Sequence, residues 1–265
     1  MAGFALGDGM CSARAAVKFA LLNCSKAPAD AMAKIGEALQ LYLAIVCAAW
    51  ERVPIAVEWM PGVTAAPAGT IALIVFDHPD AAGALGYHAI DGQGRPYGRA
   101  FLDVVPDGEL LFDKGGTGAS LAGVLSHEAA ETALDVFAGF WSDGPLVDRQ
   151  TGQSHGEVAL ELCDPVQEQA FAVSCADGTK VDGSNFVLPA WFSAAAPPGT
   201  AVDQMGVLGS PLSIAAGGYA IVRDAGADGQ VEARKRVYHP VRPANWREST
   251  KKHPAARTAR RLRAA

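Results

Sequence analysis

The chain has 265 residues, of which half are hydrophobic and 19% are charged; this is enough apolar material for one large domain and excludes a disordered protein. The net charge of −6 is unevenly distributed, because residues 234–265 hold eleven of the 22 Lys and Arg and one acid, which leaves −16 on the remainder. Five scattered cysteines without a Cys-x-x-Cys pair exclude a disulfide framework and favour free thiols in a reducing compartment.

No signal peptide or membrane span is expected. The N-terminus lacks a basic start followed by an apolar run and a cleavage site. The longest apolar stretch, residues 39–50, is shorter than the roughly 20 residues that cross a bilayer. The sequence therefore predicts a core helix there and no membrane partner.

The first 113 residues predict two helices and a series of strands. Residues 12–24 fit a short helix, and a longer helix begins near Pro28, a residue type favoured in the first turn, and ends at about Glu51. Apolar runs bounded by turn residues predict strands at 55–60, 70–78, 84–90 and 99–105, and a further strand at 109–113.

The second half is less regular. After the glycine-rich residues 115–118, interpreted as a flexible connection rather than a phosphate loop, the sequence predicts a helix over 120–137 with Ser120 as its N-cap. Residues 156–164 fit a helical turn or a strand, and residues 185–192 fit a packed loop or an edge strand. Residues 217–224 and 230–238 predict a hairpin. Together these elements predict an α+β fold with a mixed sheet.

The stretch SHEAAETALDV (126–136) is close to the His-Glu-x-x-His signature of zinc peptidases, with Glu131 in place of the second His. Residues four apart lie on one helix face, about 6 Å along the axis, so His127 and Glu131 can bind one ion. Glu128 then stands where zinc peptidases have the general base that activates water. The alternative interpretations are a site that has lost its metal and an ordinary acidic helix.

A zinc site of this kind needs a third protein ligand. If residues 156–164 are helical, Glu157 and Glu161 share a face and Asp164 lies one turn further along. We rank Glu161 first, because similarity to one branch of zinc peptidases implies a Glu from a downstream helix, then Asp164, and His155 third, since imidazole is a common zinc ligand. Asp135 lies about 12 Å from His127 along the helix axis, which is too far to share the ion, so it is expected to support the site or to contact a later loop. Zinc is the expected cofactor, and manganese, iron or no metal are the alternatives.

Other candidate residues have simpler explanations. His78 and His88 flank predicted strands and are more typical of structural residues than of ligands. Ser126 is not expected to form a catalytic pair with His127, because adjacent helix positions diverge. Trp191 and Phe192 are expected to anchor the second half of the chain in the core.

The motif helix, together with ELCDPV (161–166), SNFVLPAWF (184–192) and GGYAIV (217–222), resembles a family of uncharacterised phage and prophage proteins. The order of elements is also similar to that of the zincin catalytic domain. The resemblance covers about residues 70–225 and implies a zincin-like domain over 28–225. An N-terminal arm (1–27) precedes this domain, and the end of a hairpin with a basic C-terminal arm (226–265) follows it.

Two functions follow from these observations. The first is a metal-dependent peptidase, or a protein derived from one, with His127, Glu131 and Glu161 as ligands and Glu128 as base. The second, implied by the resemblance, is an inactive structural component of a phage particle, made in the host cytoplasm and carried in the virion. Its basic arm would dock on other virion proteins or on further copies of the chain, and non-specific nucleic-acid binding is the alternative. The arm residues are Lys251, Lys252, Arg257, Arg260, Arg261 and Arg263.

Overall fold

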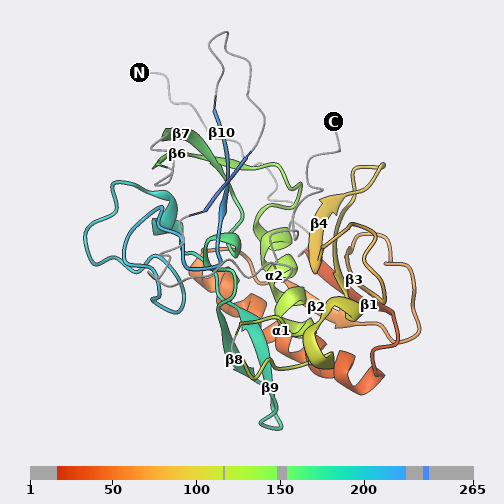
Figure 1. Ribbon diagram of the computed structural model, residues 1–265. Coiled ribbons are helices and arrows are strands. Elements are labelled where there is room, and N and C mark those ends of the chain that lie inside the picture. Colours follow the sequence, from red (N-terminus) through yellow and green to blue (C-terminus); the bar gives the residue numbers. More distant parts are fainter. Residues whose placement is uncertain (1–16, 116, 148–153, 225–234, 239–265) are drawn as a thin grey trace, which may run out of the picture.

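The computed structural model describes residues 17–115, 117–147, 154–224 and 235–238, and it shows an α+β protein with two α-helices in this part of the chain (Figure 1). The elements in chain order are β1 (Lys18–Cys24), α1 (Ala29–Ala49), β2 (Ala56–Trp59), β3 (Ile71–Phe76), β4 (Gly86–Ile90), β5 (Pro96–Phe101), α2 (Leu121–Leu134), β6 (Trp141–Val147), β7 (Ser154–Ala159), β8 (Ala170–Ser174), β9 (Lys180–Ser184), β10 (Ala220–Arg223) and β11 (Lys235–Val237).

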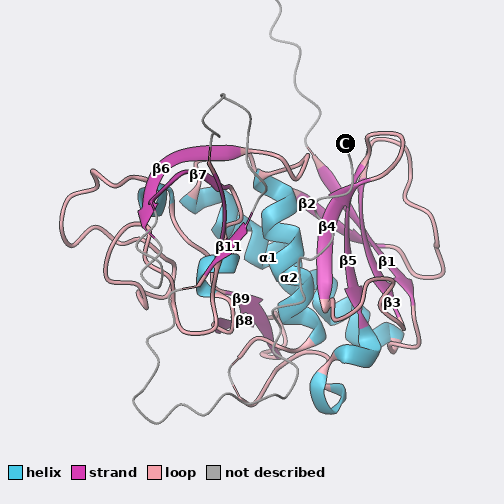
Figure 2. Cartoon of the chain, turned by 45° about the horizontal axis from the view of Figure 1, so that its top comes forward, coloured by secondary structure: helices cyan, strands magenta, loops and turns pink. Residues whose placement is uncertain are grey.

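The largest sheet has five strands in the order β2-β1-β3-β5-β4. Its first four strands pair in parallel, whereas β4 pairs antiparallel with β5 and forms one edge. Both helices lie beside this sheet, and α2 packs on β4 and β5 (Figure 2). The predicted mixed sheet is therefore confirmed, and its antiparallel edge strand lies against the helix that carries the motif.

The predicted helix over 12–24 is wrong for residues 18–24, which form β1 at an interior position of the sheet. Phe19 to Leu22 are fully buried in succession, which is the pattern of a parallel strand covered on both faces. The folded unit therefore begins before residue 28, although the sequence assigned residues 1–27 to an arm.

Helix α1 matches the prediction and packs one apolar side against the sheet. Its N-cap is Pro28, and its buried residues are Met32, Ile35, Gly36, Ala38, Leu39, Tyr42, Leu43, Val46 and Cys47. By length and composition alone α1 is apolar enough to cross a membrane, but half of its most apolar window is buried inside the protein. A core helix of a globular domain has the same character.

Helix α2 is buried on nearly all sides, with 13 of its 14 residues inaccessible. Ser120 caps it as predicted, accepting a hydrogen bond from the Gly123 N–H. The helix ends at Leu134 rather than at Phe137, because the Asp135 carboxylate accepts the N–H groups of Gly139 and Phe140 and turns the chain. Phe137, the last residue of the predicted helix, lies beyond its end and is 55% exposed.

Two smaller sheets complete the fold. One has the order β11-β10-β7-β6, and the other is the β8-β9 hairpin. The predicted pairing of 217–224 with 230–238 is confirmed by the antiparallel contacts of β10 and β11. The strand predicted over 99–105 instead covers 96–101, because residues 102–104 form a 3-10 turn, and residues 109–113 form no strand.

Several predicted residues lie outside the described part. These are Cys11, the side chain of His155, and the arm residues Lys251, Lys252, Arg257, Arg260, Arg261 and Arg263. The four described cysteines, Cys24, Cys47, Cys163 and Cys175, are free thiols, as the sequence predicted.

Candidate metal centre

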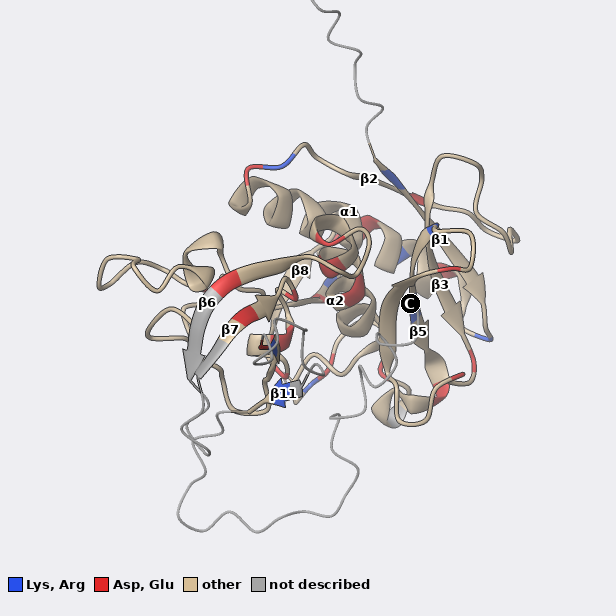
Figure 3. Cartoon of the chain, turned by 90° about the horizontal axis from the view of Figure 1, so that it is seen from above, with Lys and Arg blue, Asp and Glu red and all other residues tan. Residues whose placement is uncertain are grey.

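Helix α2 lies in the middle of the protein, packed on the five-stranded sheet and on β9, and its acidic residues are coloured red in Figure 3. We define the buried cluster as His88, His127, Glu128, Glu131, Asp135, Glu161 and Asp164. Each of these seven side chains belongs to a residue that is at most 4% exposed. Ionisable groups are seldom buried unless they are paired or bind metal, so the cluster is the first place to look for function.

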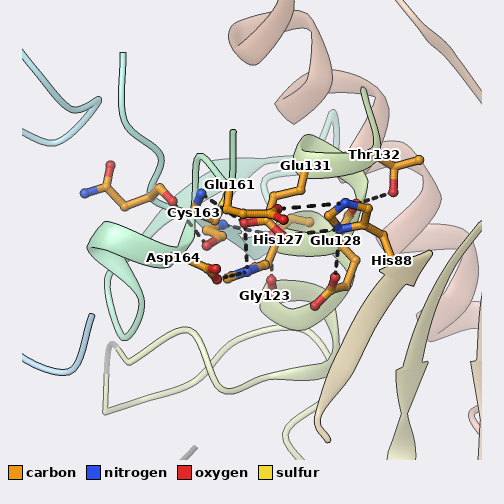
Figure 4. Close-up of polar contacts among 12 residues, drawn as sticks. His88, Gly123, His127, Glu128, Glu131, Thr132, Glu161, Cys163 and Asp164 are labelled. Atoms are coloured by element: carbon orange, nitrogen blue, oxygen red, sulfur yellow. Dashed lines mark hydrogen bonds and ion pairs between the residues drawn. The ribbon is translucent and has the colours of Figure 1, made fainter. Parts of the chain in front are cut away.

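His127 and Glu131 point to one spot, and Asp164 from the following loop meets them there (Figure 4). His127 Nε2 lies 3.3 Å from Glu131 Oε1 and 3.2 Å from Asp164 Oδ1. Two ligand atoms that each lie 2.0–2.2 Å from a tetrahedral zinc ion are about 3.4 Å apart. The spacing fits three ligands around one ion as well as it fits ion pairs of a protonated imidazole, and one ligand atom from each of the three residues lies within 4.8 Å of the others.

The loop holds Asp164 against α2 through backbone contacts. The Cys163 N–H donates to Glu131 Oε1 over 3.3 Å, and the Tyr219 N–H donates to the Asp164 carbonyl over 3.0 Å. Pro165 is the second residue of a 3-10 turn over Asp164–Val166, and its carbonyl accepts the Ala215 N–H. Asp164 is therefore the third candidate ligand beside His127 and Glu131. The sequence analysis had ranked Glu161 first for this role.

Glu161 and Asp135 meet a different imidazole, that of His88 on β4. His88 Nδ1 lies 3.5 Å from Glu131 Oε2 and 3.7 Å from Glu128 Oε2, and its Nε2 lies 3.8 Å from Glu161 Oε2. The sequence interpretation of His88 as a structural residue missed this arrangement. Residues 86 and 88 lie on the same face of β4, because side chains alternate along a strand. Gly86 packs on Val124 and Glu128 of α2, so His88 also faces this helix. The alternation would have shown that His88 belongs to the site if the packing of β4 on α2 had been known.

The other candidates lie away from the buried cluster. Glu157 is on β7, where both carboxylate oxygens bind the Arg223 guanidinium at 2.6 and 3.0 Å. His78 is exposed and pairs with Asp103. Ser126 donates to the Gly123 carbonyl and accepts the Ser184 N–H, so it is structural, as the sequence predicted.

The electrostatics of His127 favour a positive charge. Burial lowers the pKa of the imidazole, but Glu131 and Asp164 outweigh it and raise the pKa to about 10. At neutral pH the metal-free imidazole is therefore protonated, and a cation must displace that proton to bind. Burial raises the pKa values of the nearby Cys163 thiol and Tyr42 phenol, so both are neutral in the metal-free protein.

No family model, curated protein or solved structure matches the chain. The geometry supports a coarse statement without such a comparison: buried His, Glu and Asp side chains lie within metal-binding distance of one another. The nitrogen and oxygen donors suit zinc and manganese alike, so the donor set does not single out one metal.

Proposed function

We propose that this protein is a zincin-like, metal-dependent hydrolase that cleaves peptide bonds. His127, Glu131 and Asp164 hold the cation, and Glu128 acts as the general base. The observation that carries the proposal is the convergence of His127 Nε2, Glu131 Oε1 and Asp164 Oδ1 at 3.2–3.3 Å beside Glu128.

The fold supports the zincin-like assignment in its order of elements. A long helix and a mixed sheet precede a helix with a His-Glu-x-x-Glu motif, and the third ligand comes from a downstream loop. The antiparallel strand β4 runs along the edge of the sheet nearest that helix. The similarity to zincins therefore includes the order of helices and strands around the motif as well as the motif itself.

A divalent zinc or manganese ion held by His127, Glu131 and Asp164 would supply Lewis acidity toward a substrate carbonyl and a bound water. Glu128 takes a proton from the attacking water and returns it to the departing amine. Its side chain lies between α2 and the sheet, where a Cβ added to Gly86 would come within 3.1 Å of Glu128 Cγ. Because residue 86 has no side chain, it leaves room for the Glu128 side chain.

Metal analysis combined with hydrolysis of a peptide library tests the proposal. Glu128→Gln is expected to abolish hydrolysis and to keep the cation at the His127 position, because the base does not hold that ion. His127→Ala and Asp164→Asn are expected to lose both the cation and hydrolysis. Glu157→Gln is the matched control, since its carboxylate pairs with Arg223, and it is expected to change neither. A wild-type protein that binds no divalent cation would refute the proposal.

Complete burial favours a second candidate, in which the cation is structural. Glu131 and Asp164 are 0% exposed and His127 is 2% exposed, whereas catalytic metals keep an open position and structural metals are closed in by protein. In this case the protein is an inactive component of a phage particle, with partners that bind its C-terminal arm. A tightly bound cation without hydrolysis of any peptide in the library is the result that favours this candidate.

A further inference from the structure

The two carboxylate oxygens of Glu131 face two different imidazoles. Oε1 lies 3.3 Å from His127 Nε2 and also accepts the Cys163 N–H, whereas Oε2 lies 3.5 Å from His88 Nδ1. The imidazoles come from separate elements, α2 and β4, so the sequence spacing of the motif does not impose this arrangement. A carboxylate with one oxygen directed at each of two nitrogen donors has the geometry of a ligand shared by two ions.

Each imidazole also has a carboxylate of its own. Asp164 lies beside His127, and Glu128 lies beside His88, with Oε2 at 3.7 Å from His88 Nδ1. His88, Glu128 and Glu131 therefore form a second group in which one ligand atom per residue fits within 4.8 Å, and all three residues are buried. The two groups overlap only at Glu131.

We propose that the buried cluster is a two-cation centre bridged by Glu131. The first cation is bound by His127, Glu131 Oε1 and Asp164, and the second by His88 Nδ1, Glu131 Oε2 and Glu128. Both positions take divalent zinc or manganese, for which imidazole nitrogen and carboxylate oxygen are suitable ligands. The inference rests on the proposed function through the shared ligand Glu131, but it adds a metal position that the His-Glu-x-x-Glu motif does not contain.

The surroundings of His88 orient it for this role. Its second nitrogen, Nε2, faces Glu161 Oε2 at 3.8 Å, and a metal-binding histidine commonly directs its other ring nitrogen at a carboxylate. Asp135 lies within metal-binding distance of His88 and Glu161, and its carboxylate is fixed by the Gly139 and Phe140 N–H groups. Glu161 and Asp135 are therefore positioning residues for His88 and not ligands of the first cation.

The two positions place Glu128 in two roles. With one cation bound, its carboxylate serves as the base of the proposed reaction. With the second cation bound, that carboxylate is a ligand and no longer accepts the proton. Binding of the second equivalent is therefore expected to lower hydrolysis, which links metal content to activity.

Equilibrium dialysis of the full chain against zinc, followed by elemental analysis, measures the stoichiometry. The wild type is expected to bind two equivalents. His88→Ala is expected to bind one, with an unchanged affinity for it, and the matched control His78→Ala, which alters the exposed histidine paired with Asp103, is expected to bind two. Glu128→Gln is expected to keep the first equivalent and to lose the second.

Electron paramagnetic resonance of the wild type loaded with manganese gives a readout that needs no variant. Two ions that share a carboxylate lie about 3.5–4 Å apart and couple magnetically, so a coupled spectrum is expected at two equivalents. It is expected to revert to that of isolated ions in His88→Ala and in the milder His88→Gln.

The outcomes separate this inference from the proposed function. One equivalent in the wild type, lost in His127→Ala, overturns the two-cation centre and leaves the proposed function standing. One equivalent lost in His88→Ala but kept in His127→Ala overturns both proposals. Two equivalents that persist in His88→Ala show that the second ion binds elsewhere, and this also overturns the inference.

Discussion

The protein buries carboxylates in two contrasting ways. Asp203, in the loop after residue 200, accepts hydrogen bonds from the side chain of Asn185 and from the N–H groups of Met205, Val207 and Leu208 at 2.9–3.1 Å. In the buried cluster, Glu131 and Asp164 instead face an imidazole at 3.2–3.3 Å. Both kinds of carboxylate are at most 2% exposed, so burial alone does not distinguish them.

The difference is in what surrounds the oxygens. Around Asp203 the neighbours are neutral N–H donors, three from the backbone of its own loop and one from the Asn185 side chain, and their hydrogen bonds stabilise the charge and shape the loop. Around Glu131 the described side chains are titratable groups from α2, β4 and the loop after β7, and imidazole exchanges a proton for a metal ion. We therefore interpret the Asp203 site as part of the fold and the buried cluster as a site for cations.

The largest expected difference between the Asp203 site and the buried cluster is the stabilisation of the protein by metal. At a free zinc concentration about 1,000 times the dissociation constant, the wild type is expected to gain about 4 kcal/mol in free energy of unfolding. Asp164→Asn is expected to lose the part of this gain that the cation at His127 contributes, because it lacks a ligand for that ion. Urea titrations with zinc and with a chelator measure both values. An equal gain in the variant would contradict the assignment of Asp164.

The next largest expected effect is the loss of stability when Asp203 is replaced. Asp203→Ala removes the acceptor of the Asn185 amide and of the Val207 and Leu208 N–H groups, whereas the Met205 N–H keeps Asn185 Oδ1 as an acceptor. The substitution is expected to lower the free energy of unfolding by about 3 kcal/mol in the presence of chelator, while zinc stoichiometry stays unchanged. Glu58→Gln removes a carboxylate from an exposed pair with Lys18 and is the control, with an expected cost below about 1 kcal/mol. If Asp203→Ala also changed the zinc stoichiometry, the two sites would not be independent.

The smallest effect is the pH dependence of zinc affinity. The carboxylates raise the pKa of His127 to about 10, so between pH 7 and 9 the imidazole must release a proton before it binds a cation. Zinc affinity is expected to rise about tenfold per pH unit over this range, or about 1.4 kcal/mol. Calorimetry in two buffers of different ionisation enthalpy is expected to show about one proton released from His127 per ion. Affinity independent of pH would mean that His127 is neutral in the metal-free protein.

The parts of the site that depend on local spacing could be predicted from the sequence. Helix α2, its Ser120 cap and the joint direction of His127 and Glu131 all follow from positions within one helix. The position of Asp164 could not, because residues 156–164 fit a helix or a strand equally well, and only the strand β7 brings Asp164 rather than Glu161 to His127.

His88 was missed for a related reason. Its direction depends on β4 pairing antiparallel with β5 and packing on α2, which are contacts between distant segments. The same limit applies to β1, where KFALLNC was assigned to a helix although its successive buried residues form a strand between β2 and β3. Periodicity does not separate the two when an apolar run is this short.

The enclosure of α2 has a consequence for the rate at which ions exchange. The helix is covered by the sheet on one side and by β9 on another, and the hydroxyl groups of Ser120 and Ser126 bond to Asp182 and Ser184 on that hairpin. Helices buried in this way open only when most of the surrounding structure opens. If the ion at His127 is the enclosed, structural ion of the second candidate, its residence time is expected to be set by the opening rate of the protein, and a chelator is expected to remove it no faster at higher chelator concentrations; removal that speeds up with chelator concentration is expected for an open, catalytic ion.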